Sequence, residues 1–507
     1  MKAARSNFQT GLVLIICALH VPVFAQAPFW EWARSVTNTY GAPDTHVQAT
    51  DGGCFWSVSG SPTFLPNDTL MGNSYLVFMN SLGELRMGVS MSEPRQLFDI
   101  GNGRIGFASE VNGSFVAGGD IYTSELGIGL ITGTVDTTGT TADIITMPDL
   151  IIGYEGHRIL DIHQGLSGNL YVLGSFLDSV AVADTVLFGQ GIYVARITQT
   201  GELIRADRYE MYPYFELSAL VEGTDGTVYV AIQNDDYQPN GLTLGMVLLS
   251  IGPDGSIVVV YDDQNTSFYQ QNQPRLSVDP NGGVVLAYSK YVGSSGGGIN
   301  VLHFNELGEL VWENAMILRA SPTKIEATDD GGILVSGYGV SPIPWPGLEY
   351  MGAGPNCVVY EINEDNEVLW AIAENTGNVY GANASKNSAG EVYAAGYFEI
   401  SARYGTHTLP YDNSPFSSYI ARIGYGWLGI NEHGSRPLSM HPNPAHDRLW
   451  VALPETAAVM VQLIDHQGRV LREERTRGGQ IEIDVSGISS GAYVVRSGSS
   501  VGQVVIE

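Results

Sequence analysis

Charged side chains are scarce in this chain of 507 residues, because they make up only 15% of it, where about 25% is usual for a soluble protein. Only four lysines occur, so no basic patch can be built from lysine. Acids outnumber bases, and the formal net charge is −29. Nucleic acid and anionic membrane surfaces should repel such a chain. We therefore expect no nucleic-acid partner, and the 44% of hydrophobic residues exclude a disordered chain.

Cysteine is nearly absent, with three residues in all. Cys17 lies in a segment that we expect to be removed, and Cys54 and Cys357 are 303 positions apart without C-x-x-C spacing. We expect both to be free buried thiols, with a disulfide between them as the alternative. The histidines show no H-E-x-x-H or paired spacing either. The sequence therefore predicts no metal site and no cofactor.

Long apolar runs are missing as well, since no stretch reaches the roughly 18 residues that a membrane-spanning helix needs. The run from Gly11 to Ala18 is too short to span a membrane. It follows Lys2 and Arg5 and precedes a small residue at Ala25. This pattern predicts a secretory signal peptide over residues 1–25, and a mature chain without a transmembrane segment.

Glycine, at 62 residues, and tyrosine, at 26, are abundant instead, as is typical of strands joined by tight turns. A Gly-rich turn followed by a short apolar strand recurs seven times. The copies are DGGCFWSVSG from Asp51, NGSFVAGG from Asn112, SGNLYVLGS from Ser167, DGTVYVAI from Asp225, NGGVVLAYS from Asn281, DGGILVSGY from Asp330 and AGEVYAAGY from Ala389. The glycines before these strands are 49 to 60 positions apart. Such a period indicates a repeat architecture.

A second motif, a strand, a turn and another strand, alternates with the first. Its copies are YLVFMNSLGELRMG from Tyr75, a weaker LGIGLITGTVDTTGT from Leu126, IYVARITQTGELIRA from Ile192, MVLLSIGPDGSIVVV from Met246, INVLHFNELGELVWE from Ile299 and CVVYEINEDNEVLWA from Cys357. Each period therefore supplies four strands and shows no helical periodicity. We predict an all-β fold in which residues 26–425 form a seven-bladed β-propeller.

The seventh copy of the second motif is incomplete, because residues 419–423 have no partner strand after them. The chain before the first turn has a strand to spare, and FWEWARS at residues 29–35 is similar to LVWENA at residues 310–315. We predict that residues 29–35 pair with residues 417–423 and complete the last blade, which removes open sheet edges. Trp30 and Trp32 should then pack at the seam between strands rather than bind a ligand.

In its DGG turns, its strands with small residues and its hairpins with a Gly and a Trp, the region from residue 29 to residue 425 resembles the repeats of secreted bacterial β-propellers often called SBBP repeats. The resemblance implies an extracellular propeller. It implies no ligand, because propellers of unrelated function share such turns.

The last part of the chain has a different pattern. A linker at residues 426–437 leads into a tail at residues 438–507. Two runs of alternating apolar residues in this tail indicate half-buried strands: Val459, Val461 and Leu463, then Ile481, Ile483 and Val485. Together with a turn at residues 466–468, they predict a small antiparallel β-sandwich.

The tail also carries several short motifs in a characteristic order. They are Pro442-Asn443-Pro444, Leu463-Ile464-Asp465 followed by Gly468, Asp484-Val485-Ser486, and Ser490-Gly491-Ala492-Tyr493. On these residues the tail resembles the type A C-terminal sorting domain of Bacteroidetes proteins that use the type IX secretion system, although the usual lysine-rich ending is absent. The resemblance implies periplasmic passage, recognition of residues 438–507 by the outer-membrane translocon, and commonly removal of the tail or surface attachment. Pro442, Asn443, Pro444, Gly468, Gly491 and Tyr493 would be recognition elements and not catalysts.

Short catalytic motifs occur in this chain without the context that they need. The G-x-G-x-x-G match at residues 101–106 precedes a strand pattern and not a helix, so we expect a turn. Three G-x-S-x-G matches, around Ser295, Ser489 and Ser500, lack a strand–turn–helix setting. Aspartates such as Asp225 are expected to cap tight turns rather than to bind Ca²⁺. We assign no catalytic residue.

Ligand contacts are expected in the connections between the second and third strands of each blade, because these loops surround one entrance of a propeller channel. The aromatic candidates there are Trp345, Tyr350, Tyr237 and Tyr404. Exposed aromatic side chains on such loops would suit an extracellular glycan or a peptide.

Two functions are compatible with these patterns. A third possibility is that the propeller only fills space in a surface layer. We favour a secreted or cell-surface protein for binding or adhesion without catalysis. The alternative is an extracellular polysaccharide or peptide hydrolase or lyase with carboxylates at the channel mouth. Carboxylates that converge there with an Arg, a Tyr or a His would favour the enzyme, whereas an aromatic, uncharged mouth would favour binding.

Overall fold

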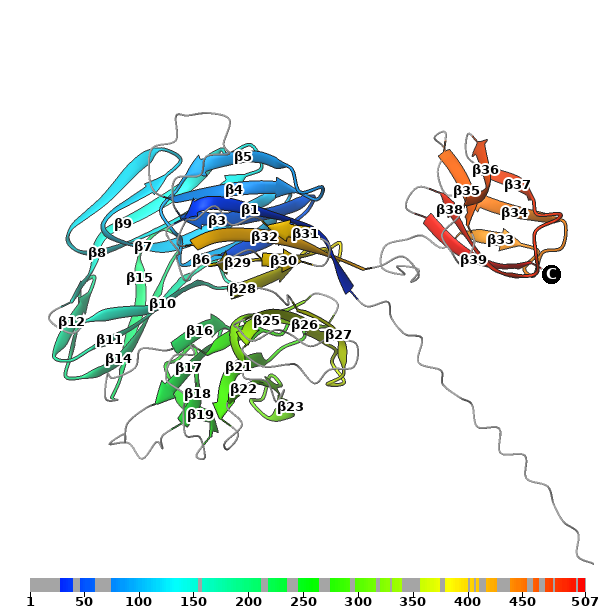
Figure 1. Ribbon diagram of the computed structural model, residues 1–507. Coiled ribbons are helices and arrows are strands. Elements are labelled where there is room, and N and C mark those ends of the chain that lie inside the picture. Colours follow the sequence, from blue (N-terminus) through cyan, green and yellow to red (C-terminus); the bar gives the residue numbers. More distant parts are fainter. Residues whose placement is uncertain are drawn as a thin grey trace, which may run out of the picture.

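The computed structural model describes residues 28–39, 46–59, 74–153, 157–210, 218–234, 245–263, 274–291, 297–315, 320–328, 331–339, 356–373, 379–399, 402–404, 407–409, 416–425, 438–453, 459–464, 470–476, 479–497 and 500–506 (Figure 1). All regular elements in these ranges are strands, and none is a helix. The all-β prediction is confirmed. The predicted signal peptide lies outside the described residues.

Within the described part of residues 28–425, the strands form seven antiparallel sheets of four or six strands and one separate two-stranded hairpin. Sheet 1 consists of β2 (Val47–Thr50), β3 (Gly53–Ser59), β4 (Ser74–Asn80) and β5 (Leu85–Ser90), and sheet 2 contains β6 (Gln96–Gly101), β7 (Arg104–Ala117), β8 (Asp120–Asp136) and β9 (Thr141–Gly153). Sheet 3 consists of β10 (Arg158–Gln164), β11 (Leu170–Phe176), β14 (Gly191–Ile197) and β15 (Leu203–Tyr209), and sheet 4 of β16 (Ser218–Glu222), β17 (Val228–Asn234), β18 (Gly245–Ile251) and β19 (Ile257–Asp262). Sheet 5 consists of β20 (Arg275–Val278), β21 (Val284–Tyr291), β22 (Gly297–Phe304) and β23 (Leu310–Ala315), and sheet 6 of β24 (Ala320–Ala327), β25 (Ile333–Gly339), β26 (Asn356–Ile362) and β27 (Val368–Ala373).

Sheet 7 is assembled from both ends of this region. It contains β28 (Val379–Lys386), β29 (Val392–Phe398), β32 (Phe416–Tyr425) and, as its fourth strand, β1 (Pro28–Thr39). Trp32 lies opposite Arg422 and Arg34 lies opposite Ile420. In Figure 1 the dark blue β1 runs beside the gold β32. The predicted pairing of residues 29–35 with the strand at residues 417–423 is confirmed.

The first strand of each sheet contacts the first strand of the next sheet. These contacts run from β2 through β6, β10, β16, β20, β24 and β28, and β28 contacts β2 again. Between successive sheets the buried side chains form apolar clusters, such as Val172 and Tyr193 of sheet 3 with residues of sheet 2. Burial of these faces stabilises the arrangement by roughly 25 cal/mol for each Å² of apolar surface removed from water.

A second repeated contact joins the fourth strand of one sheet to the turn between the third and fourth strands of the next. A side chain of the fourth strand covers the glycine of that turn so closely that a methyl group on the glycine would lie between 1.9 and 3.7 Å from it. The pairs are Trp32 on Gly83, Met87 on Gly139, Met147 on Gly201, Arg205 on Gly255 and Val260 on Gly308, with 3.5 Å for the last. The contact of β1 with sheet 1 therefore has the same form as the contacts that four other fourth strands make with the next sheet.

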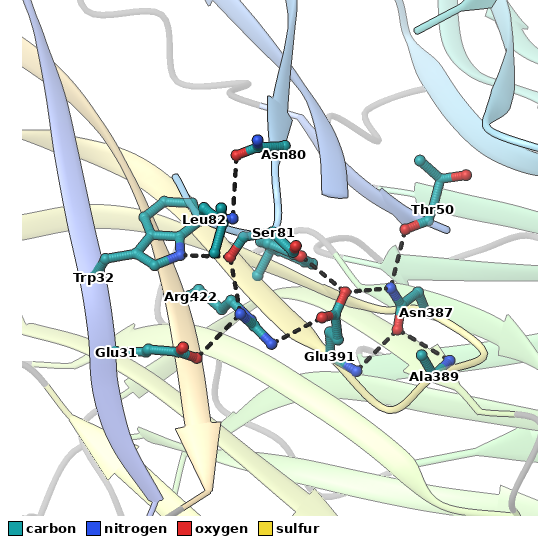
Figure 2. Close-up of polar contacts among 11 residues, drawn as sticks. Glu31, Trp32, Thr50, Asn80, Ser81, Leu82, Asn387, Ala389, Glu391 and Arg422 are labelled. Carbon is teal, nitrogen blue, oxygen red and sulfur yellow. Dashed lines mark hydrogen bonds and ion pairs between the residues drawn. The ribbon is translucent and has the colours of Figure 1, made fainter. Parts of the chain in front are cut away.

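Two tryptophans show this equivalence in detail. Trp312 on β23 donates its Nε1–H to the backbone oxygen of Glu364, at 3.1 Å, in the turn of sheet 6. Trp32 on β1 donates in the same way to the backbone oxygen of Ser81, at 3.0 Å, in the turn of sheet 1 (Figure 2). Trp32 is 6% exposed, which confirms that it packs at a seam. The side chain of Trp30 lies outside the described side chains.

Both turns are built by the same asparagine chemistry. Asn80 accepts a hydrogen bond from the backbone N–H of Glu84 at 2.9 Å, and Asn363 accepts one from that of Glu367 at 2.7 Å. An asparagine side chain that bonds nearby backbone groups in this way fixes a tight turn. The recurring N-x-x-x-E spacing is thus a turn signal in the sequence.

The seam between sheets 7 and 1 also carries charge (Figure 2). The guanidinium of Arg422 lies 3.2 Å from Glu31 on β1 and 2.8 Å from Glu391, and it donates to the backbone oxygen of Ser81 at 2.8 Å. One side chain thereby joins β32, β1 and the turn of sheet 1. Only 18% of the Arg422 side chain is exposed, so water screens these interactions weakly.

Sheet 2 departs from the predicted repeat. The sequence places its first turn at Gly113, but residues 112–114 form an irregularity inside β7, and the turn lies at residues 101–103. The GNG of the G-x-G-x-x-G match is that turn, so the expectation of a turn there is confirmed. The turn was misplaced because Asn112-Gly113 lies inside the long strand β7, and an Asn-Gly pair suits both a turn and a bulge.

Hairpins fill two of the connections between second and third strands. In sheet 3, β12 (Ser179–Val182) and β13 (Thr185–Phe188) form a hairpin that pairs with β9 and extends sheet 2 to six strands. In sheet 7, β30 (Ala402–Tyr404) and β31 (His407–Leu409) form the other hairpin. Covering an edge strand in this way removes unpaired backbone groups.

The described residues of the tail form two further sheets around one core. The first contains β33 (Ser439–His441), β34 (Arg448–Leu453) and β37 (Gly479–Asp484), and the second contains β36 (Val470–Thr476), β35 (Val459–Ile464), β38 (Gly491–Ser497) and β39 (Ser500–Ile506). Leu449, Val451 and Ile483 of the first sheet belong to one buried cluster with Leu463 and Val495 of the second. This part of the chain has its own core.

Candidate functional site

The first strands of the seven sheets line a cavity of about 1090 Å³, which we call the axial cavity. This volume lies slightly above the range that small-ligand sites usually occupy, roughly 300 to 1000 Å³. Polar and apolar residues contribute to its walls in similar measure, and Phe98 and Phe115 are their only aromatic carbocycles among the described residues.

Equivalent positions of the first strands form a ring in the wall of this cavity. In each sheet, the first apolar residue of the second strand pairs with a residue of the first strand, and the ring position lies three residues before that partner. In sheet 3, for example, Leu170 pairs with Gln164, and the ring position is Asp161. Across the seven sheets, the ring position is occupied by His46, Gln96, Asp161, Ala219, Arg275, Lys324 and Asn383. Six of these seven side chains are polar, although they come from seven different repeats.

A second ring lies two residues further along the same strands. Its members that line the cavity are Gln48, Phe98, His163, Val221, Ser277 and Glu326. Side chains two positions apart lie on the same side of a strand, so both rings face the same space.

Side chains of one sheet bind the free backbone edge of the next sheet. The N–H of Ala49 donates to Ser385 at 3.1 Å, and that of Ala327 donates to Ser277 at 2.9 Å. The N–H of Leu220 donates to Asp161 at 2.9 Å. Unpaired N–H groups along a buried edge would be costly, and these contacts satisfy them.

The tautomer of His163 follows from its neighbours. The backbone N–H of Gln164 donates to Gln96 Oε1 at 2.6 Å, so the other amide atom of Gln96 must be its NH₂ group. That group lies 3.0 Å from His163 Nδ1, which must therefore accept, and the proton of the ring is on Nε2. Burial lowers the pKa of His163 to about 4, so the ring is a neutral hydrogen-bond donor at neutral pH.

Asp161 has an unusual ionisation. Burial raises its pKa to about 6, although the backbone N–H groups of Leu220 and Ile162 and the charges of Arg275 and Arg95 oppose that change. The N–H of Ile162 lies 2.8 Å from Asp161 Oδ1. The carboxyl therefore changes charge just below neutral pH.

Lys324 belongs to a hydrogen-bond network that joins three sheets at the cavity wall. Its ammonium lies 2.9 Å from Glu326 on its own strand and donates to the backbone oxygen of Val47 in sheet 1 at 3.2 Å. Glu326 in turn accepts from the hydroxyl of Ser385 and from the N–H of Lys386, both at 2.9 Å. Sheets 6, 7 and 1 are joined by this network.

The carboxylates that line the axial cavity are engaged by the protein itself. Glu110 lies 2.8 Å from Arg95, Asp99 accepts from Thr50 at 3.1 Å, and Glu222 accepts from Ser167 at 2.8 Å. A general acid or base must reach a substrate proton directly or through one water. Carboxylates that already bind backbone groups or form ion pairs are better suited to hold the walls of a binding site in place than to act as a general acid or base.

Metal ligands do not gather in the part of the chain that the structure describes, where no group of three or more His, Cys, Asp or Glu could hold an ion. Cys54 and Cys357 are both buried thiols that form no disulfide, as expected. Burial raises the pKa of the Cys54 thiol, and the charge of Glu391 acts in the same direction. Neither cysteine lines the axial cavity.

The structure describes one of the aromatic candidates from the sequence, Tyr404, and that residue does not line this cavity. Trp345, Tyr350 and Tyr237 fall outside the described residues. Tyr404 is fully buried on the hairpin β30–β31, where its ring centre lies 4.7 Å from that of Tyr419. The prediction that Tyr404 is an exposed loop side chain is wrong, because the hairpin packs into the core of sheets 6 and 7.

The predicted capping role is confirmed for Asp225 and Asp279. Asp225 accepts from the N–H of Thr227 at 2.9 Å, and Asp279 accepts from that of Asn281 at 2.8 Å. The polar ring of the axial cavity was missed by sequence reasoning. The sequence signal for this ring is a polar residue at a fixed distance before the first turn of six of the seven repeats. The first strands are too short for an alternation of polar and apolar residues to be obvious.

The sorting-motif residues tie the tail together. Asn443 accepts a hydrogen bond from the N–H of Val505 at 2.9 Å, which fastens the Pro442–Pro444 segment to the last strand, β39. Tyr493 is 8% exposed, and its hydroxyl donates to the backbone oxygen of Ser489 at 2.5 Å. Gly491 begins β38, and Gly468 lies outside the described residues.

Residues 439–506 match the family described as the secretion system C-terminal sorting domain, which confirms the resemblance of the tail. The protein is therefore a type IX secretion substrate that is exported to the cell surface or secreted. No helix in the described ranges is long and apolar enough to cross a membrane. Among curated proteins, none matches this sequence.

Several solved structures align with this chain at low identity. Streptogramin B lyase aligns at 12% identity with a TM-score of 0.40, over 77% of this chain and 97% of the lyase. PorZ, an essential bacterial surface component of the type-IX secretion system of Porphyromonas gingivalis, aligns at 11% identity with a TM-score of 0.28, over 92% of this chain and 70% of PorZ. A protein of unknown function from Bacteroides caccae aligns at 12% identity with a TM-score of 0.32, over 59% of this chain and 89% of that protein. Similarity at this level identifies neither a ligand nor a reaction.

Proposed function

We propose that this protein is a secreted or cell-surface binding protein, a seven-bladed β-propeller closed by β1, whose ligand occupies the axial cavity. Residues 1–25 are its signal peptide, 26–425 the propeller, 426–437 a linker and 438–507 a β-sandwich that the type IX translocon recognises. Seven sheets whose first strands contact one another in a cycle support the propeller. Two sheets around one core support the sandwich.

The observation that carries the binding function is the ring of polar side chains in the axial cavity. Seven equivalent positions contribute six polar residues, each of a different kind: His, Gln, Asp, Arg, Lys and Asn. Ala219 is the exception. A purely structural channel needs no such variety at one level. Polar groups of different kinds that converge in a large cavity fit the recognition of one particular polar ligand.

The engaged carboxylates support binding over catalysis. Asp161 holds two backbone N–H groups, and Glu326 holds a hydroxyl and a backbone N–H. A hydrolase or lyase would need at least one carboxyl free to move a proton. The alternative keeps two arguments in its favour. Asp161 converges with Arg95, Arg275 and His163 in a charged cavity, which is the arrangement expected of the enzyme, and the pKa of Asp161 is about 6, near the value of a useful acid or base.

A glycan and peptide array tests the proposal, with hydrolysis assays run on the same ligands. The sample is the chain as it is exported, in the unchanged form and as the Asn383→Leu variant, which alters the cavity wall. Binding without turnover that the variant weakens supports the proposal. Turnover that Asp161→Asn abolishes would favour the enzyme, and a chain silent on every ligand would contradict both.

Export is tested separately by deletion of residues 438–507 in a type IX-competent host. The shortened protein should accumulate in the periplasm with its thermal unfolding unchanged. Substitution of Asn443 by Ala should slow export less than the deletion does, because it removes one hydrogen bond to β39. Normal surface delivery of the deleted chain would contradict the assigned role of the tail.

A further inference from the structure

A second cavity lies at the seam between sheets 4 and 5, and we call it the seam pocket. It has a volume of about 230 Å³, below the usual range of small-ligand sites, so it is of a size for a single side chain. Its walls are the first turn of sheet 4, at residues 223–227, and the turn between β22 and β23 of sheet 5, at residues 305–309. No residue lines both this pocket and the axial cavity.

The seam pocket is acidic. Asp225 and Glu306 line it, and no Lys, Arg or His of the described chain is among its lining residues. The carboxylate of Glu306 forms no hydrogen bond or ion pair with any described residue. Asp225 accepts from the N–H and the hydroxyl of Thr227, at 2.9 and 2.8 Å, and these neutral donors leave its charge uncompensated. The pocket therefore offers two carboxylates to a cation.

Tyr229 is an independent indication of a ligand. It lines the seam pocket and is 4% exposed, and its hydroxyl has no hydrogen-bond partner in the part of the chain that the structure describes. Burial raises the pKa of this hydroxyl, and the charge of Asp225 acts in the same direction, so it stays neutral. The hydroxyl of so buried a tyrosine usually has a partner. A polar group held in the pocket would supply one.

In two other seams an arginine of the chain itself lies beside the equivalent tyrosine. Tyr171 pairs with Arg196 across β11 and β14, and Tyr393 pairs with Arg422 across β29 and β32. The guanidinium carbon of Arg196 lies 5.5 Å from the centre of the Tyr171 ring, a cation–π contact. The same guanidinium lies 3.8 Å from Glu222 of the next sheet. These seams thus contain their own cation.

Sheet 4 has a serine at this position, because Tyr229 pairs with Ser250 in the same register. The facing turn nevertheless matches the one that Arg422 contacts, since NELGE at residues 305–309 corresponds to NSLGE at residues 80–84. Arg422 donates to the backbone oxygen of Ser81, the second residue of its turn, at 2.8 Å (Figure 2). The second residue of the turn in sheet 5 is Glu306. An equivalent guanidinium would therefore lie beside Glu306, at the seam pocket.

We propose that the seam pocket binds an arginine side chain of a partner protein, whose guanidinium takes the place that internal arginines have in the other two seams. A guanidinium carries five N–H donors in one plane, so a single group can contact Asp225, Glu306 and the hydroxyl of Tyr229. The apolar stem of the arginine packs on Leu307, which is 76% exposed at the rim. The net charge of −29 attracts a cationic partner. This site is independent of the ligand of the axial cavity.

The test is titration of the full exported chain into acetyl-Gly-Arg-Gly-amide, followed by NMR line broadening of the peptide. Peptides with citrulline or lysine in place of arginine are the comparison, because citrulline keeps the shape of the side chain and lacks its charge. We expect the arginine peptide to bind about tenfold more tightly than the citrulline peptide, and added salt to reduce that difference. Equal binding of these two would overturn the inference. Tighter binding of the lysine peptide would overturn the assignment to arginine.

Variants locate the effect in the seam pocket. Ser250→Arg supplies sheet 4 with its own arginine, so it should weaken binding of the arginine peptide about tenfold, and Glu306→Gln should weaken it about fivefold. Glu364→Gln is the matched control, because Glu364 has the position of Glu306 in the turn of sheet 6 and does not line the pocket. Thermal unfolding shows whether each variant is folded. A folded Ser250→Arg chain that binds the arginine peptide unchanged would overturn the inference.

The Asn383→Leu variant separates the seam pocket from the axial cavity. It should leave binding of the arginine peptide unchanged, because Asn383 lines only the axial cavity. If Asn383→Leu weakens this peptide and Glu306→Gln does not, the peptide binds in the axial cavity. The inference then fails and the proposed function stands.

Discussion

Sheets 6 and 7 have the same strand order but are built from the chain in different ways. Sheet 6 uses one continuous stretch, from β24 to β27, whereas sheet 7 joins residues 379–425 to β1 at the start of the described chain. Bringing ends ~390 residues apart together costs about 5 kcal/mol by the logarithmic loop-closure relation. The contacts of β1 must offset that cost, and they include a buried Trp, a strand ladder and a charged cluster.

The comparison places the break in connectivity inside sheet 7, between β32 and β1. Trp32 on Ser81 repeats the contact of Trp312 on Glu364, and each tryptophan lies on a fourth strand that continues along the chain into the sheet it contacts. The seam between sheets 7 and 1 adds Arg422, which the seam between sheets 5 and 6 lacks in this form. We expect the closing seam to be the place where the fold is most sensitive.

The largest effect should come from removing β1. A chain that starts at residue 40 should lose more than about 5 kcal/mol, because it loses the Trp32 side chain and a full ladder of antiparallel hydrogen bonds at once. Thermal unfolding and hydrogen exchange of β32 measure this loss. Deletion of residues 438–507 is the control and should leave the unfolding temperature unchanged. An unfolding temperature that does not fall when β1 is removed would show that the fold does not depend on β1.

Substitution of single tryptophans should have the next largest effect. Trp32→Ala should cost about 3–5 kcal/mol, as for other buried aromatic side chains. Trp312→Ala should cost about half as much, because Trp312 is only partly buried. Denaturant unfolding of both variants decides the order. Equal costs would show that the two seams are energetically alike.

Arg422 should contribute less than Trp32 but more than an ordinary surface arginine. Arg422→Gln should cost about 2–3 kcal/mol, since it leaves Glu391 with a partly buried charge and breaks a contact to β1. Arg86→Gln, at a pair more than half exposed, should stay within about 0.5 kcal/mol. The same unfolding assay compares them, and a cost for Arg422→Gln no larger than that for Arg86→Gln would contradict the role of this cluster.

Glycine substitutions sharpen the comparison at a smaller scale. Gly83 and Gly308 both have a positive φ, of 74° and 75°, so alanine at either should cost about 1 kcal/mol. A methyl group on Gly83 would lie 2.7 Å from the Trp32 ring, whereas one on Gly308 would lie 3.5 Å from Val260. Gly83→Ala should therefore cost about 1 kcal/mol more than Gly308→Ala. A smaller cost at Gly83 would mean that the Trp32 ring can move.

Acid–base behaviour distinguishes the axial cavity from the seam. The pKa of Asp161 is about 6 in the folded chain, above its unfolded value near 3.8, so the folded state binds the proton more tightly. Its contribution to stability is full below about pH 4 and is lost as the pH rises through 6. Asp161→Asn should remove that fall between pH 4 and 7. Arg95 and Arg275 face this carboxyl, and His163 is close by with its opposite slope, so the difference between variant and unchanged chain is the quantity to measure. Parallel stability curves would contradict the assigned ionisation.

Much of the arrangement of the seven sheets could be predicted from local sequence patterns. Turn glycines, apolar strands and the likeness of FWEWARS to LVWENA together predicted β1 beside β32. The misplaced turn at Gly113 shows the limit, because an Asn-Gly pair in the long strand β7 has the same local signal as a turn. The burial of Tyr404 was likewise missed, since a short hairpin between strands gives no sign of which side it packs against.

The candidate site could not be predicted in the same way. The seven side chains of the ring come from seven repeats, and successive members lie 49 to 65 positions apart in the sequence. Nothing in a single strand shows that His46 and Lys324 border one cavity. The ionisation of Asp161 depends on Leu220, Arg95 and Arg275, which only the arrangement of the sheets brings near it.

By itself the amino-acid order determined where strands begin and turn, which strand is left over at the start of the chain, and that residues 439–506 direct export, because each of these depends on neighbours within a few positions. The tertiary structure alone decided which polar groups meet in the axial cavity and which carboxylates are already engaged. Hydrogen bonds and burial depend on distances in space, and the packing of the seven sheets against one another sets those distances.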